Sequence, residues 1–204
     1  MNSRDLQSLA PCIELPSPPS ESKKTLFLDL DDTLVRVCEL AGTFSNMHVL
    51  HSRADFSFRL RTAGFEQRFL VYKRGGLDQF LKFASEYFEV VLYTAATKEY
   101  ADAVLGAIDP TGTIFAHRLY RNDCVQAGQG RYIKSLKKVA NRALNKCILV
   151  DDNEDNFSAN PGNCLIIEPI DLDEQDTELR DLTFILTKLN LMQDFCGFLR
   201  KMAE

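Results

Sequence analysis

The sequence predicts an α/β protein built on a doubly wound, mainly parallel sheet, with a small β-hairpin insertion after the first strand. Three observations support this fold class. Short apolar runs alternate with segments of helical periodicity, acidic or hydroxyl side chains follow the main runs, and a stretch of strict alternation interrupts the pattern after the first run. Apolar runs that alternate with helical segments are typical of βαβ units, in which a crossover helix joins two parallel strands.

The N-terminal residues 1–22 contain four prolines and five serines and have little periodic apolar content. This composition is typical of an unstructured segment rather than of a core element. We therefore predict a flexible tail over residues 1–22 and a single domain over residues 23–204.

The main strands are expected at the apolar runs 25–28, 88–93 and 147–150, with a fourth strand at 165–167. Helical spacing of apolar residues after Gly75-Gly76 predicts a helix from Leu77, and similar patterns predict helices over 98–108 and 132–144. A last amphipathic helix is expected to pack on the sheet through one face, formed by Leu179, Leu182, Ile185, Leu186 and Leu189.

An insertion over residues 36–72 separates the first strand from the first helix. Phe56, Phe58 and Leu60 alternate with polar residues there, and Gly64 and a second apolar stretch follow. This pattern predicts a β-hairpin. Because the insertion leaves the sheet directly after an acidic loop, we expect it to begin at the mouth of the site and to serve as a substrate platform.

Composition limits the function classes. The 204 residues are 45% hydrophobic and 26% charged, as in ordinary globular proteins, and carry a formal net charge of −5. The acidic balance argues against nucleic acid and anionic membrane surfaces as direct partners, because both favour a basic face. The apolar runs are short, so we expect a soluble, intracellular protein without a membrane span, in nucleus or cytoplasm. No heptad repeat demands a dimer, and we expect a monomer.

Polar side chains follow each of the three main strands. Asp29 and Asp31 follow the first, Thr94 the second, and Asp151 and Asp152 the third. The carboxyl ends of parallel strands lie side by side, so these side chains should converge on one crevice. Two unpaired carboxylates about 4 Å apart repel by about 4 kcal/mol at an effective dielectric of about 20, so a metal, a lysine or a shared proton is required.

Lys134 is the lysine expected to reach this crevice, from near the start of the helix predicted over 132–144. Each residue also has a simpler interpretation: an aspartate after a strand can cap a helix, a threonine can bond the backbone, and a lysine is usually solvated. Asp32 fits the capping interpretation. Together, however, the carboxylates, the hydroxyl and the lysine indicate metal-assisted phosphoryl transfer to a carboxylate nucleophile.

The ordered motifs resemble those of the haloacid-dehalogenase superfamily and, within it, the FCP/SCP-type small protein serine/threonine phosphatases that act on the polymerase C-terminal domain. The resemblance covers roughly residues 24–190. It includes LDLDDTL (28–34), VYKRGG (71–76), LYTAA (92–96), KEYADAVL (98–105), RLYRNDC (118–124), GRYIKSL (130–136), ILVDDN (148–153) and DTELRDL (176–182).

The resemblance implies a Rossmann-like haloacid-dehalogenase core and a defined mechanism. Asp29 would attack phosphorus and become an aspartyl-phosphate, while Asp31 would protonate the departing seryl or threonyl oxygen and then activate water. Mg²⁺ would be held by Asp29, the backbone carbonyl of Asp31 and Asp152, with Asp151 beside them orienting the loop or a metal-bound water.

The resemblance also implies a substrate site. Thr94 and Lys134 would bind the phosphoryl group. The substrate would be a phosphoserine or phosphothreonine segment of a protein, with the RNA polymerase II C-terminal domain as one candidate. The residues expected to contact it are Thr33, Leu60, Phe69, Tyr100 and Arg121.

Three alternatives remain open at this stage. A phosphatase for small metabolites usually encloses its substrate under a larger cap than this insertion provides. A response-regulator receiver has its acids, threonine and lysine in a different order. A phosphoprotein-binding scaffold of the same fold has no need of a leaving-group acid, so the presence of both Asp29 and Asp31 argues against it.

Overall fold

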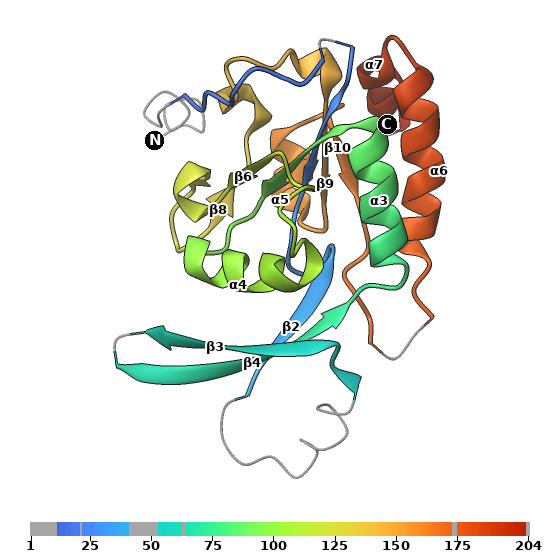
Figure 1. Ribbon diagram of the computed structural model, residues 1–204. Helices are drawn as coiled ribbons and strands as arrows, with labels where there is room; N and C mark the ends of the chain where they lie inside the picture. Colours follow the sequence, from blue (N-terminus) through green and yellow to red (C-terminus); the bar gives the residue numbers. More distant parts are fainter. Residues whose placement is uncertain (1–11, 21, 41–52, 63, 173–174, 203–204) are drawn as a thin grey trace.

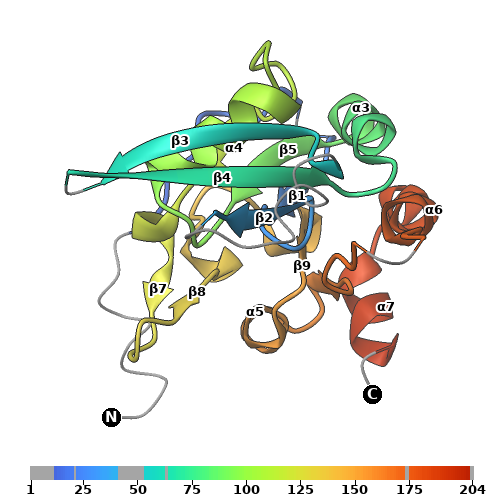
Figure 2. The same ribbon diagram turned by 90° about the horizontal axis from the view of Figure 1, so that it is seen from below.

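The computed structural model describes residues 12–20, 22–40, 53–62, 64–172 and 175–202. At its centre lies a five-stranded sheet in the order β10-β9-β1-β5-β6 (Figures 1 and 2). All four strand pairings in it are parallel, which confirms the predicted α/β class. The strands are β1 (Thr25–Leu28), β5 (Glu89–Tyr93), β6 (His117–Leu119), β9 (Cys147–Asp151) and β10 (Cys164–Ile166). The edge strand β6 was not predicted, because its three residues include only one that is buried.

The two faces of the sheet follow the alternation of the strands. Leu26 and Leu28 of β1 belong to one buried cluster, whereas Phe27 belongs to another on the opposite face. The first face is covered by the long helices α3 (Leu77–Tyr87), α4 (Lys98–Ile108), α6 (Glu178–Leu191) and α7 (Phe195–Met202). The second is covered mainly by short elements: the hairpin of β7 (Val125–Gln126) and β8 (Tyr132–Ile133), 3₁₀ turns, and α5 (Glu154–Ala159). None of the helices in the described ranges is both long and apolar enough to cross a membrane.

The predicted helices over 77–87 and 98–108 are present, and so is the last amphipathic helix, α6. Its buried residues are Leu179, Leu182, Leu186 and Leu189. Ile185 is 39% exposed, which corrects its predicted place on the buried face. The other four follow one stripe at spacings of three and four residues, and Ile185 lies at its margin.

The helix predicted over 132–144 is wrong. This segment forms β8 and two 3₁₀ turns, Leu136–Lys138 and Leu144–Lys146. The N–H of Lys134 donates to Asn156 Oδ1 at 2.8 Å and that of Leu136 to Asn160 Oδ1 at 2.9 Å. Backbone donors that a helix would direct to its own preceding turn are therefore satisfied by the side chains of Asn156 in α5 and of Asn160 at its C-terminal end, and apolar spacing alone could not reveal this.

Within the segment 1–22, predicted to be a flexible tail, residues 12–20 instead pack against the domain. We call these residues the N-terminal strap. Leu15 is only 6% exposed and belongs to the core cluster of the second face. Its N–H donates to Asn141 Oδ1 at 3.1 Å, and Ile13 pairs with Val139 in an isolated bridge. Because the backbone at 138–142 is irregular, its N–H and C=O groups are not all paired within a helix or sheet, and the strap forms hydrogen bonds with this segment. Residues 1–11 and 21 lie outside the described ranges.

The insertion contains the predicted hairpin and one further strand. Strands β3 (Phe56–Thr62) and β4 (Phe65–Lys73) pair antiparallel, and β2 (Val35–Glu39) pairs with the other edge of β4. Figure 2 shows the hairpin lying across the end of the central sheet, beside α4. The rest of the insertion, 41–52 and 63, lies outside the described residues.

Candidate active site

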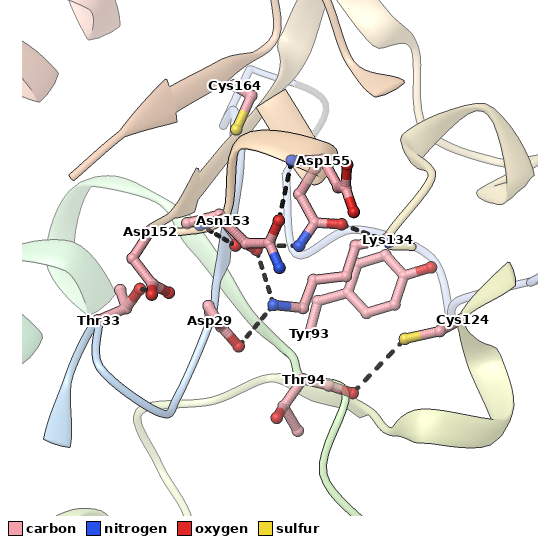
Figure 3. A network of polar contacts seen from close by, with 12 residues as sticks. Asp29, Thr33, Tyr93, Thr94, Cys124, Lys134, Asp152, Asn153, Asp155 and Cys164 are labelled. Atoms are coloured by element: carbon pink, nitrogen blue, oxygen red, sulfur yellow. Dashed lines mark hydrogen bonds and ion pairs between the residues drawn. The ribbon is translucent and has the colours of Figure 1, made fainter. Parts of the chain in front are cut away.

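The first acid, Asp29, directly follows β1 and is held at the sheet by its backbone, since its N–H donates to the carbonyl of Val150 at 3.0 Å. Its carboxylate is almost fully buried. The Nζ of Lys134 lies 2.6 Å from Asp29 Oδ1, as Figure 3 shows. The predicted convergence of these two side chains is therefore present in the structure, although Lys134 comes from the segment between β8 and a 3₁₀ turn rather than from a helix.

Lys134 bridges the first and third strands. Its side chain is 2% exposed, and its Nζ also lies 2.7 Å from Asp151 Oδ2. Burial would lower the pKa of Lys134, but the Asp29 and Asp151 carboxylates outweigh it and raise the pKa above its ordinary value. The lysine is therefore an ammonium group that neutralises part of the acidic cluster.

The two neighbouring acids of the third strand have different surroundings. Asp151 is fully buried, and its Oδ1 accepts the N–H of Asn153 and the Nδ2–H of Asn156, both at 3.0 Å. Asp152 is half-buried, and its Oδ1 accepts the hydroxyl of Thr33 at 3.3 Å. Asp151 thus has both oxygens engaged by protein groups, whereas among the described residues Asp152 has one side-chain partner, Thr33.

Thr33 is completely buried, so the structure does not place it where a substrate would contact it. Its hydroxyl instead orients Asp152. Asp32, interpreted from the sequence as a helix cap, lies in a turn with φ 60, and its carboxylate pairs with Arg36 at 2.6 Å. The residue after Asp32, Thr33, is buried, which a pattern of residue types does not show.

The acidic cluster fits a divalent cation. One carboxylate oxygen from each of Asp29, Asp151 and Asp152 lies within 4.8 Å of the others. Burial raises the pKa of Asp29 against the opposing effect of Lys134, and burial together with Asp151 raises the pKa of Asp152. One ammonium therefore does not fully compensate these carboxylates, and an all-oxygen set of this kind suits a hard cation such as Mg²⁺. The carboxylate of Asp31 is not part of this cluster. The backbone carbonyl of Asp31, which the resemblance implies as a ligand, stays a prediction.

The second acid of the first strand, Asp31, faces a different neighbour. The hydroxyl of Tyr100, on α4, donates to Asp31 Oδ1 at 2.6 Å. Burial raises the pKa of Asp31, and the hydrogen bond from Tyr100 opposes that effect. A buried carboxyl with a raised pKa holds a proton more readily than an exposed one, which suits a general acid.

Asp29, Asp31 and Thr94 line one hollow of about 460 Å³. Thr94 Oγ1 accepts the N–H of Ala96 at 3.0 Å, which leaves its hydroxyl hydrogen available for a ligand. The predicted substrate residues Leu60, Phe69, Tyr100 and Arg121 line the same hollow.

The wall of this hollow that faces α4 is aromatic. The rings of Phe58 and Phe69 stack at 5.0 Å, and each meets Tyr100 edge-on at 5.7 Å. Arg121 is fixed at another side, where its Nε donates to the carbonyl of Ala95 at 2.7 Å and its guanidinium lies over the ring of Tyr132. The hollow thus combines an acidic floor with an apolar wall and one cation.

Several supporting residues were missed by sequence reasoning. Asn156 and Asn160 fix Lys134 and Asp151, and Gln67 lines the hollow. Arg74 is buried and donates to the carbonyl of Thr33 at 3.1 Å and to Asp176 Oδ2 at 2.8 Å, which ties the acidic loop to the start of α6. The two asparagines, four residues apart just after the acid pair, were the one signal available in the sequence.

Comparisons with known proteins agree with this geometry. A family model described as NLI interacting factor-like phosphatase matches residues 24–196. Among curated proteins, the chain is 35% identical over 171 residues to a probable C-terminal domain small phosphatase of Dictyostelium discoideum, covering 84% of this chain and 52% of the relative. It is 32% identical over 203 residues to the CTD small phosphatase-like protein of Homo sapiens, covering 94% and 69%.

Solved structures give the same result. The structure of the fission yeast RNA polymerase II CTD phosphatase Fcp1 bound to beryllium fluoride matches with a TM-score of 0.61 and 26% sequence identity, over 84% of this chain and 52% of that one. A second Fcp1 structure matches with a TM-score of 0.61 and 28% identity, over 84% and 50%. This chain therefore spans about half the length of these structural relatives.

Proposed function

The chain belongs to the NLI interacting factor-like phosphatase family, and from that premise we propose that it is a Mg²⁺-dependent phosphoprotein serine/threonine phosphatase that acts through an aspartyl-phosphate. The observation that supports the proposal most strongly is that two acids with different environments line one hollow. Asp29 is paired with Lys134, whereas Asp31 is paired with Tyr100.

In the first step, a carboxylate oxygen of Asp29 attacks phosphorus and the bond to the seryl or threonyl oxygen breaks. Asp31 gives its proton to the departing oxygen. Lys134 favours the ionised form of Asp29 and orients it, because its ammonium stabilises the negative form of the carboxylate. The hydroxyl hydrogen of Thr94 is available to a phosphoryl oxygen.

In the second step, the Asp31 carboxylate takes a proton from water, the water oxygen attacks phosphorus, and the Asp29 carboxylate departs as phosphate is released. The same residue thus acts first as acid and then as base. Asp29 and Asp152 would hold Mg²⁺, which supplies positive charge to the phosphoryl oxygens. Asp151 serves this arrangement indirectly, since its oxygens bind Lys134 and the loop.

The shape of the hollow favours a protein substrate over a metabolite. The hairpin stands beside the hollow, and its Phe69 contributes to an apolar wall that a side chain next to the phosphoresidue can contact. The relatives named as C-terminal domain phosphatases make the RNA polymerase II C-terminal domain one candidate substrate.

The test measures phosphate release from an aryl phosphate and from a phosphoserine peptide, each with Mg²⁺ and with a chelator. We expect activity only in the metal-loaded wild type and loss of activity in Asp29→Asn. Asp32→Asn is the matched control, because it makes the same chemical change in the same loop but at a carboxylate paired with Arg36. Asparagine also tolerates the left-handed φ of this position.

The result separates the alternatives. Turnover of free phosphometabolites in preference to peptides would favour the metabolite phosphatase. A folded wild type that binds the phosphopeptide but turns over neither substrate would favour the scaffold. Activity that survives Asp29→Asn would show that the nucleophile is another residue. A mass increase of one phosphoryl group on the wild type, absent from Asp29→Asn, would identify the intermediate.

A further inference from the structure

A second hollow, of about 420 Å³, lies between the N-terminal strap and the edge strand β6. We call it the strap hollow. Strap residues 12–16 line one side, β6 lines another, and Asn122, Asp123 and Lys138 complete it. None of the residues assigned to catalysis lines it.

Lys138 is the feature of the strap hollow that requires a partner. The residue is only 7% exposed, yet the one hydrogen bond of its Nζ in the described chain runs 3.3 Å to the carbonyl oxygen of Asp123. An ammonium group carries three donors, and a buried charge without a counter-ion is costly. Lys134, by contrast, has two carboxylates within 2.7 Å.

The other charged groups of the strap hollow leave this ammonium uncompensated. The carboxylate of Asp123 is hydrogen-bonded within the 3₁₀ turn of which Asp123 is part, where Oδ2 accepts the N–H of Tyr120 at 2.8 Å. Arg118 has Asp102 and Asp109 as partners at 3.7 and 3.6 Å, and His117 lies 3.3 Å from Glu89. Glu14 is exposed on the strap, where solvent screens its charge.

The strap hollow and the active-site hollow are linked by residues that each shares with a third hollow between them. Thr97 and Arg121 line both the active-site hollow and an intermediate hollow of about 330 Å³. Asn122 and Asp123 line both that intermediate hollow and the strap hollow. The segment that follows β6 thus borders all three in succession, and a polypeptide held at Asp29 can extend along it.

We propose that the strap hollow binds a second acidic side chain of the same polypeptide substrate, several residues from the phosphoresidue that is cleaved. The inference rests on the proposed phosphatase function and adds a substrate class: phosphoproteins with a second phosphoserine, phosphothreonine or carboxylate at a fixed spacing. Lys138 is the residue that recognises this group, by a charge-assisted hydrogen bond.

The experiment uses a series of peptides with one cleavable phosphoserine and a second group placed at increasing distance on either side. The second group is a phosphonate that cannot be hydrolysed, a glutamate or a glutamine. For the wild type we expect one spacing at which an acidic second group raises kcat/KM about tenfold or more over glutamine, mainly through KM, since a hydrogen bond to a charged group has about this effect. Comparing kcat/KM of the phosphonate peptide with that of the glutamate peptide shows which anion is preferred.

Lys138→Met should remove this preference and leave turnover of the glutamine peptides and of an aryl phosphate unchanged. Lys137→Met is the matched control, because Lys137 is the adjacent but exposed lysine and should keep the preference. If Lys138→Met does not fold, Lys138→Gln takes its place, with aryl phosphate turnover as the measure of an intact active site.

Two results would overturn the inference: a wild type that is active on aryl phosphate but shows no preference at any spacing, or a preference that survives in a Lys138 variant. Either would leave the phosphatase function standing. Failure of the folded wild type on aryl phosphate and on every peptide would instead contradict the proposed function itself.

Discussion

Replacing Lys134 by methionine tests the electrostatic core of the site. The substitution keeps most of the side-chain volume but removes an ammonium that lies 2.6 Å from Asp29 and 2.7 Å from Asp151. All three side chains are at least nine-tenths buried. The variant would therefore leave two carboxylates in the interior without their shared cation.

The expected cost follows from this geometry. Removing one partner of a buried ion pair costs about 3–5 kcal/mol. Here one cation serves two acids, so we expect about 5 kcal/mol. A change of 1 kcal/mol shifts the midpoint of thermal unfolding by about 2–4 °C in a chain of this size, which gives a loss of roughly 10–20 °C.

The loss of stability in Lys134→Met should depend on pH. Burial raises the pKa of Asp29 and Lys134 opposes it, so without the lysine the folded-state pKa rises further above the unfolded value. A group whose pKa is raised on folding stabilises the protein when protonated, and that contribution is lost as pH rises. The unfolding midpoint of the variant should therefore lie further below that of the wild type at pH 8 than at pH 5.

The assay is thermal unfolding followed by circular dichroism, in chelator and then with Mg²⁺. Lys137→Met, at an exposed position, should stay within about 0.5 kcal/mol of the wild type. Mg²⁺ should recover part of the loss in Lys134→Met, because a ligand that binds only the folded state stabilises it. A Lys134→Met midpoint within about 2 °C of the wild type in chelator would refute the reasoning.

Three further predictions address other parts of the molecule. Tyr100→Phe removes the hydroxyl 2.6 Å from Asp31 and should lower the rate of phosphate release about tenfold; an unchanged rate would mean that the hydrogen bond does not orient the acid. Leu15→Ala should cost about 2–5 kcal/mol in urea unfolding because Leu15 is buried, whereas Cys12→Ser at an exposed position of the same strap should cost little. Burial alone would raise the pKa of Glu89, but hydrogen bonds from Arg142 and Thr25 lower it below its ordinary value, so its stabilising effect should be lost as pH falls from about 5, and Glu89→Gln should show a flatter acid limb in urea unfolding.

The parts of the site that the sequence predicted lie close to strand ends. β1, β5 and β9 are apolar runs, and the residues after them must meet once the strands are parallel. Asp29, Thr94 and Asp151 were therefore found from local pattern alone. A lysine beside these acids was one of three compensations expected in advance, with a metal and a shared proton, because buried charges of one sign require compensation.

The parts that could not be predicted depend on contacts between distant segments. The apolar spacing of Tyr132, Leu136 and Val139 is helical, but Asn156 and Asn160 take the backbone donors of this segment from across the fold. Leu15 stands among prolines, and it is held by a hydrogen bond to the side chain of Asn141 and by burial in the core, both of which involve residues distant in sequence. Neither effect has a signature within a window of neighbouring residues.

Strand alternation explains why one lysine binds acids from two neighbouring strands. Asp29 has the parity of Phe27, whose face of the sheet is covered by irregular segments, including the one that carries Lys134. Asp151 has the parity of Leu149 on the same face, and so the lysine binds both. Asp152, one residue on, turns to Thr33 instead. Asp31 has the same parity as Asp29 but lies in the loop beyond the end of β1, where it pairs instead with Tyr100 of α4, on the helical face. The proposed nucleophile, Asp29, is thus held from one face of the sheet and the proposed acid, Asp31, from the other, so their environments can differ within one loop.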